Sequence, residues 1–140
     1  MNRLRRCALL AVIPLLVLAC TNQPNEAIMQ GASPVQLRSY QTRVFESSEK
    51  LSMLCSVVAT LQDLGFVIDE ASVDLGTVTG TRASGSRIRI TVVVRPRGDN
   101  QLMVRASAYF ELEPIEDPEP YQDFFNALEK AVFLTAQQVD

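Results

Sequence analysis

Two long alternating segments separated by a turn constrain the fold of this chain more than any other feature. Residues 87–95, RIRITVVVR, and 101–112, QLMVRASAYFEL, each alternate apolar and polar residues, and PRGDN lies between them. Because successive side chains of a strand point to opposite faces of a sheet, this period predicts two antiparallel strands that share one apolar face. That predicted face carries Ile88, Ile90, Val92 and Val94 from the first strand and Leu102, Val104, Ala106, Ala108, Phe110 and Leu112 from the second.

Helices and further strands around this pair are indicated by caps and by hydrophobic period. A cap at Ser47 or Ser48 predicts a helix that ends near residue 64, and Asp117 before Pro118 predicts a second helix that ends near residue 137. Strands are predicted over residues 35–45, 66–69 and 75–82. The predicted order is β-α-β-β-β-β-α. It corresponds to an α+β fold, a two-layer sandwich in which an antiparallel sheet of four to five strands packs against two helices.

The predicted helices each have an apolar stripe for the core. In the first helix the stripe is Leu51, Leu54, Cys55, Val58 and Leu61, which makes Cys55 an inert core thiol rather than a nucleophile. In the second helix it is Tyr121, Phe124, Leu128, Ala131, Val132 and Thr135. Phe125, Phe133 and Leu134 widen the second stripe. Such width is explained either by deep burial or by a surface kept for a partner.

The N-terminal segment is too short to span a membrane. Arg3, Arg5 and Arg6 precede the apolar run 7–19, CALLAVIPLLVLA. A helix over that run would be roughly 20 Å long, whereas the hydrocarbon core is about 30 Å thick. A basic start, a short apolar run and a small residue at its end are typical of a secretory signal peptide.

The end of this run, Val17-Leu18-Ala19-Cys20, resembles the lipobox of bacterial lipoproteins. The resemblance implies cleavage between Ala19 and Cys20, a diacylglycerol on the Cys20 thiol and an acyl chain such as palmitate on the new amino group. Thr21 in place of aspartate implies the outer membrane. The predicted organisation is a signal peptide over 1–19, a lipidated cysteine and flexible tether over 20–34, and a periplasm-facing domain over 35–140.

Composition excludes several function classes for the predicted mature chain. Without the three arginines of the signal peptide, ten basic residues face sixteen acidic ones, so a nucleic-acid role is not expected. The chain has no histidine, which excludes the usual catalytic triads and zinc sites. No phosphate-binding glycine loop is present. Composition alone leaves carboxylate-pair and Ser-Lys chemistry open, but little in the sequence supports either. We therefore expect no catalytic residue, no metal and no cofactor, and predict that the protein is not an enzyme.

A second resemblance concerns residues 48–82. A helix followed by LGFVI, an acidic turn and LGTVTG is similar to the helix-grip modules of periplasmic lipoproteins such as the BamC subunit of the outer-membrane β-barrel assembly machine. Residues 36–140 also resemble small proteobacterial lipoproteins of unassigned function, through QTR, LQDLGF and EDPEPYQDFF. Neither resemblance implies a catalytic residue. The carboxylates in residues 61–82 are not predicted to bind calcium, because they lack the ligand spacing of a calcium-binding loop.

Charge gathers in two places. Six arginines lie between residues 82 and 105, and the predicted polar face of the sheet places Arg89, Arg95 and Arg105 beside Tyr109 as candidate partner-binding residues. Arginine binds carboxylates and phosphates in a bidentate manner, so a lipid, a glycan or an acidic protein is a conceivable partner. The simpler expectation is that these arginines pair with the acidic stretch 111–123. That stretch is itself explained by the positive end of the following helix dipole.

These observations predict a membrane-anchored lipoprotein. Its domain is expected to act as a non-catalytic adaptor in a cell-envelope assembly or transport complex, attached to the membrane by its N-terminal lipid and to an envelope protein by the sheet arginines or the last helix. The alternative is a binding module that holds a small anionic or lipidic ligand in a groove between helices and sheet.

Overall fold

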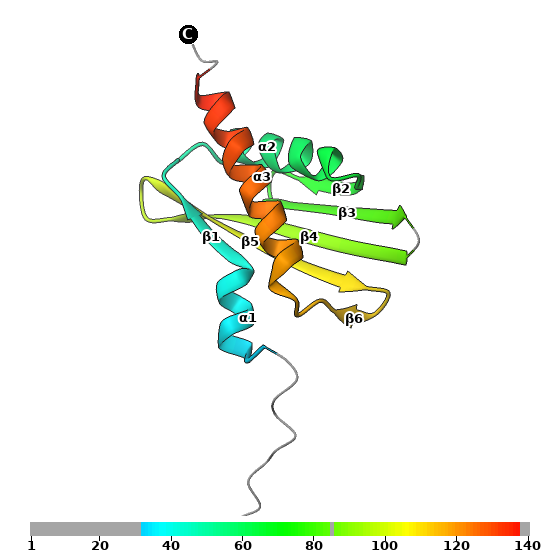
Figure 1. The fold of residues 1–140 in the computed structure, drawn as a ribbon. Coiled ribbons are helices and arrows are strands. Elements are labelled where there is room, and N and C mark those ends of the chain that lie inside the picture. Colours follow the sequence, from blue (N-terminus) through cyan, green and yellow to red (C-terminus); the bar gives the residue numbers. More distant parts are fainter. Residues whose placement is uncertain (1–31, 85, 138–140) are drawn as a thin grey trace, which may run out of the picture. The chain divides into compact units, whose positions relative to one another are not determined.

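The structure, a computed structural model, describes residues 32–84 and 86–137. Its elements, coloured by sequence in Figure 1, are α1 (Pro34–Tyr40), β1 (Thr42–Phe45), α2 (Lys50–Asp63), β2 (Val67–Ser72), β3 (Thr77–Ser84), β4 (Ser86–Arg97), β5 (Gln101–Phe110), β6 (Glu113–Pro114) and α3 (Pro118–Gln137). The predicted signal peptide, its cleavage site and Cys20 lie outside the described residues.

One antiparallel sheet contains all six strands. Its order is β1-β5-β4-β3-β2, and the short β6 pairs with β5. The longest pairing joins β4 to β5, from Ile88 opposite Phe110 to Arg97 opposite Gln101. The two alternating segments of the sequence are therefore adjacent strands, as predicted, but β5 ends at Phe110, and Leu112, which was placed on the apolar face, is exposed.

The two long helices cover one face of this sheet. Side chains of α2 and α3 share a single core with the apolar side chains of β3, β4 and β5, and α3 crosses the strands in Figure 1. Val92, Val104 and Ala106 are fully enclosed there. Burial of such side chains contributes about 1.5–3 kcal/mol each for the larger ones. The structure thus confirms a two-layer α+β sandwich.

The segment before β1 differs from the prediction. Residues 35–45 were expected to form one strand, but Pro34–Tyr40 is helical and only Thr42–Phe45 is a strand. Ser33 explains the helix, because its hydroxyl accepts from the Gln36 N–H at 3.3 Å while the Gln36 side chain accepts from the Ser33 N–H at 3.0 Å. This capping box, with proline at the first helical position, outweighs the weak alternation of the segment.

The face that helix α2 turns to the core only partly overlaps the predicted stripe, at Leu54, Leu61 and the half-buried Val58. Its buried apolar residues are Met53, Leu54, Val57 and Leu61, whereas Leu51 and Cys55 are exposed. The prediction that Cys55 is a core thiol is therefore wrong. Two overlapping apolar stripes run along this helix, and the contact with α3 selects the one that starts at Met53.

Helix α3 begins and ends where the sequence predicts. The Asp117 carboxylate accepts from the Glu119 N–H at 3.0 Å, as expected of an N-cap. Phe125 is buried with Tyr121, Phe124 and Leu128, while Phe133 and Leu134 are exposed. Among the described residues no helix is both long enough and apolar enough to cross a membrane.

One buried hydroxyl joins several of these elements. The Tyr121 hydroxyl donates to the Ile115 carbonyl at 2.7 Å and accepts from the Ala108 N–H and the Gln41 side-chain amide, both at 3.3 Å. It thereby links α3 to the end of β5, to the segment after β6 and to the residue before β1. The Tyr121 hydroxyl therefore fixes the end of β5 that carries Tyr109, through its hydrogen bond to the neighbouring Ala108.

Candidate interaction surface

The opposite face of the sheet has no helical cover among the described residues. We call it the open face. It consists of the outward side chains of the strands, and none of its described members is buried. Those of β1, β3, β4 and β5 are Thr42 and Val44 of β1, Thr77, Thr79 and Thr81 of β3, Arg87, Arg89, Thr91, Val93, Arg95 and Arg97 of β4, and Met103, Arg105, Ser107 and Tyr109 of β5.

The structure brings all four predicted partner-binding residues onto this face. Arg89 lies directly opposite Tyr109, and Arg95 lies directly opposite Met103. Arg105 is opposite Val93 and also flanks β1, where its Nε donates to the Thr42 hydroxyl at 3.2 Å. Arg105 and Tyr109 are four positions apart in β5, roughly 13 Å along the strand. The arginines therefore form two groups, one at each end of the face.

Hydroxyl groups occupy the space between the two arginine groups. Thr79 and Thr91 lie in register on β3 and β4, and their hydroxyl oxygens are 3.3 Å apart. Ser107 continues the same row on β5. The row formed by Thr79, Thr91 and Ser107 is therefore polar but uncharged, and the arginines lie on either side of it.

The open-face arginines have no carboxylate partner within the described residues. The single salt bridge there joins Arg43 to Glu129, at 3.0 Å, and it lies on the helical side, where the Arg43 guanidinium also rests 5.5 Å from the centre of the Phe125 ring. The expected pairing with the acidic stretch 111–123 is therefore wrong. Beyond Glu113 that stretch leads into α3, so Glu119 and Asp123 lie on the covered side of the sheet.

Arg82 belongs to the other face. Its guanidinium donates to the Leu64 carbonyl at 3.2 Å and lies 4.9 Å from the centre of the Phe66 ring. It therefore satisfies a carbonyl at the end of α2 and stacks on an aromatic side chain. Of the six clustered arginines, five point outward and one supports the core.

One corner of the open face combines charge with exposed apolar groups. Arg87, Arg89, Tyr109, Glu111 and Leu112 line a shallow hollow there. Tyr109 is 44% exposed and Leu112, in the tight turn between β5 and β6, is 92% exposed. Glu111 has φ of 54°, a left-handed conformation that costs a residue other than glycine roughly 1–3 kcal/mol. The chain thus uses a strained turn to present a leucine beside arginine and tyrosine, the residue types that dominate protein interfaces.

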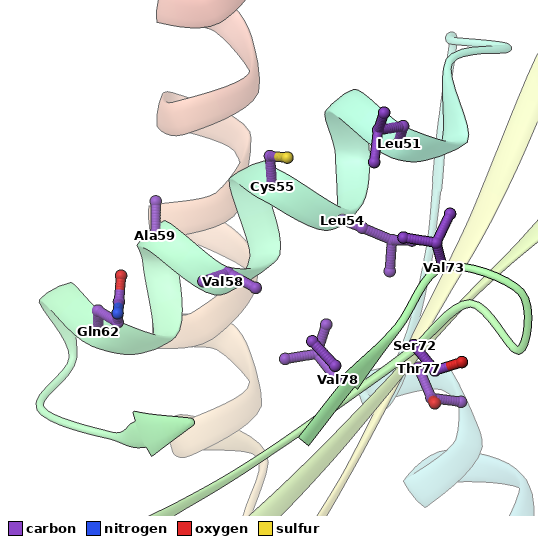
Figure 2. Close-up of a pocket in the computed structure, with 11 residues that line it drawn as sticks. Leu51, Leu54, Cys55, Val58, Ala59, Gln62, Ser72, Val73, Thr77 and Val78 are labelled. Carbon is purple, nitrogen blue, oxygen red and sulfur yellow. The ribbon is translucent and has the colours of Figure 1, made fainter. Parts of the chain in front are cut away.

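A second feature, which the sequence analysis missed, is an apolar groove between α2 and the sheet edge. Its volume is about 320 Å³, and it is lined by Leu51, Leu54, Cys55, Val58, Ala59 and Gln62 of α2 and by Ala71, Ser72, Val73, Thr77 and Val78 of the strand side. Figure 2 shows Leu54 and Val73 facing each other across it. The available signal was Leu51 and Cys55, which follow helical spacing and are exposed in the structure, but the sequence analysis assigned both to the core.

A third hollow, of about 210 Å³, lies between the start of α3 and the covered face of the sheet. Its walls are mostly apolar and include Phe66 and Phe124. Three charged residues line it, namely Arg82, Glu119 and Asp123. The Arg82 guanidinium already donates to the Leu64 carbonyl, and the other two charged residues of the lining are carboxylates. This hollow therefore does not favour an anionic ligand.

Comparison with known proteins adds no assignment. No protein-family model matches the chain, and no curated protein matches it either.

Proposed function

We propose that this protein is a membrane-anchored, periplasm-facing lipoprotein that acts as a non-catalytic adaptor in a cell-envelope assembly or transport complex. The observation that carries the adaptor part is the open face, which presents five arginines without carboxylate partners among the described residues. A guanidinium forms charge-assisted hydrogen bonds with carboxylates, so an acidic protein surface is the partner that fits.

The corner around Tyr109 offers the aromatic and apolar side chains that a protein interface needs in addition to charge. Interfaces depend on a few buried aromatic, arginine or apolar anchors surrounded by weaker contacts. Tyr109, Arg89 and Leu112 lie together at the corner, and the hydroxyl-lined centre of the face offers further hydrogen bonds. A small anionic or lipidic ligand remains the second candidate, but the third hollow carries two carboxylates.

The lipid anchor is proposed from the sequence around Cys20. We propose that the residues between Cys20 and the helix cap at Ser33 act as a tether; a flexible segment of that length has a root-mean-square length of roughly 20 Å, enough to hold the domain near the outer membrane. Intact mass and membrane fractionation of the wild type and of Cys20→Ala test this part. We expect cleavage before Cys20, added acyl mass and outer-membrane location for the wild type only. A soluble, unmodified wild type would contradict the anchor.

The contact surface is tested by co-purification from detergent-solubilised envelopes. We expect the Arg89→Gln, Arg95→Gln, Arg105→Gln triple variant to lose a partner that the wild type retains at low salt and releases at high salt. A charge-matched control replaces Arg38, Lys50 and Lys130, which lie off the open face, with glutamine. Equal retention by both triple variants would refute the role of the open face.

A further inference from the structure

The groove beside α2 is bounded by a strand edge that has no neighbour among the described residues. Strand β2 pairs only with β3 and ends the sheet. A strand at a sheet edge presents unpaired N–H and C=O groups, and these are a template for another strand. The groove therefore combines an apolar hollow with a row of backbone hydrogen-bonding groups.

The side chains of β2 differ between its two sides. Ala71 lies opposite Val78, whose side chain is buried, so Ala71 points to the groove. Glu70 lies opposite Thr79, a member of the open face, so Glu70 points to that face. The bulge between Ile68 and Glu70 turns Asp69 the same way, because its carboxylate accepts from the Thr81 hydroxyl. One side of the edge is thus apolar and the other carries two carboxylates.

We infer that β2 and the groove bind an extended peptide of another protein, which adds as a short strand to the sheet edge. The inward side chains of this peptide are apolar and fill the groove, and its outward side chains are Lys or Arg opposite Asp69 and Glu70. Main-chain hydrogen bonds give affinity in this binding mode, and pockets for alternate side chains give specificity. The bulge limits the regular free edge to Glu70–Ser72, so the added strand is short.

Two other occupants fit less well. A second copy of this chain would bring Asp69 and Glu70 against the same carboxylates, since antiparallel pairing of two β2 edges is self-complementary, and like charges on an edge strand oppose such pairing. A fatty acid has an anionic head, but the groove lining contains no charged residue. Two apolar side chains at the rim of the groove, Leu51 and Val73, are 57% and 53% exposed and suit an apolar side chain that enters from the strand edge.

This inference goes beyond the adaptor proposal, because it concerns the β2 edge and its groove rather than the open-face arginines, and a partner of opposite charge. The two surfaces can therefore fail independently.

Selection of displayed random octapeptides on the full-length chain in detergent micelles tests the inference directly. We expect enriched peptides to alternate apolar residues with Lys or Arg. A synthetic enriched peptide should bind. Methylation of one set of alternate amides should abolish binding, because those N–H groups pair with the edge, and methylation of the other set should be tolerated because those N–H groups point away from it. This comparison needs no protein variant. No enrichment, acidic consensus sequences, or binding that stays undiminished in both alternate phases of methylation would overturn the inference.

Variants then locate the site. Ala71→Trp should weaken peptide binding by about ten-fold or more, because the indole ring would fill the groove and exclude the apolar side chain of the peptide. Gln122→Trp, on the exposed side of α3, is its control. Glu70→Gln should weaken binding roughly two- to five-fold, as expected for an exposed charge pair, and Glu116→Gln should not. The open-face triple variant should bind normally.

Three results would point elsewhere and overturn the inference. They are equal binding by Ala71→Trp and wild type, displacement of the peptide by palmitate with direct palmitate binding, and a stable dimer of the wild type whose formation is abolished by Ala71→Trp. Hydrogen exchange gives an independent readout, because bound peptide should protect β2 amides and leave α3 amides unchanged.

Discussion

Removal of the Tyr121 hydroxyl should destabilise the domain far more than its small size suggests. Tyr121 is 0% exposed, and its hydroxyl is the partner of the Ala108 N–H and the Ile115 carbonyl. The Ala108 carbonyl accepts from the Ile115 N–H, so both main-chain groups of Ala108 point away from β4 toward β6 and α3. Without the hydroxyl, the buried Ala108 N–H has no partner among the described residues.

The magnitude follows from this geometry. A buried donor left without a partner costs about 1–3 kcal/mol, and loss of the hydrogen bond to the Ile115 carbonyl adds to it. We therefore expect Tyr121→Phe to lower the free energy of unfolding by about 2–3 kcal/mol. For a domain of this size that corresponds to a fall in Tm of roughly 8–12 °C.

Urea and thermal unfolding followed by circular dichroism provide the assay. Tyr109→Phe is the matched control, because Tyr109 is 44% exposed and should change stability by less than about 0.5 kcal/mol. Our reasoning would be refuted if both variants changed stability equally, or if Tyr121→Phe lay within 0.5 kcal/mol of the wild type, a difference of about the size expected of a surface substitution.

Three further predictions concern single residues. Glu111→Gly should raise the free energy of unfolding by about 1 kcal/mol in urea titrations, because glycine relieves the φ of 54°; a loss of stability would mean that the turn is not strained. Gly76→Ala should lower it by roughly 2 kcal/mol or more, since a Cβ there would lie 2.4 Å from the Val94 carbonyl oxygen and φ is +66°, and unchanged unfolding would contradict the close approach. Cys55 should react with a thiol reagent in the folded protein at the rate of an exposed thiol. Reaction only on unfolding would mean that this thiol is buried.

The strand pairs were predictable because their signal is local and strong. Residues 87–95 and 101–112 alternate over enough positions that only one face can be apolar, and the short turn between them fixes the pairing. Asp117 and Pro118 likewise predicted the start of α3 through cap chemistry alone. Both kinds of signal are complete within a few neighbouring residues.

The failures occurred where tertiary contacts decide between local alternatives. Leu51 and Cys55 have helical spacing, but so have Met53 and Val57, and only the position of α3 determines which set is buried. The orientation of Arg82 depends on Phe66 and on the end of α2, neither of which is close in sequence. The groove arises because α2 leaves part of the edge strand uncovered, which depends on how the layers pack.

Site-specific photocross-linking in living cells tests the central claim most directly. A photoreactive residue in place of Thr91 stands at the middle of the open face, and one in place of Gln122 stands on the helical side as its control. The account predicts a discrete protein adduct from position 91 that disappears in the Arg89, Arg95, Arg105 triple variant, and no such adduct from position 122. Absence of a protein adduct from position 91, or an adduct indifferent to the three arginines, would contradict it.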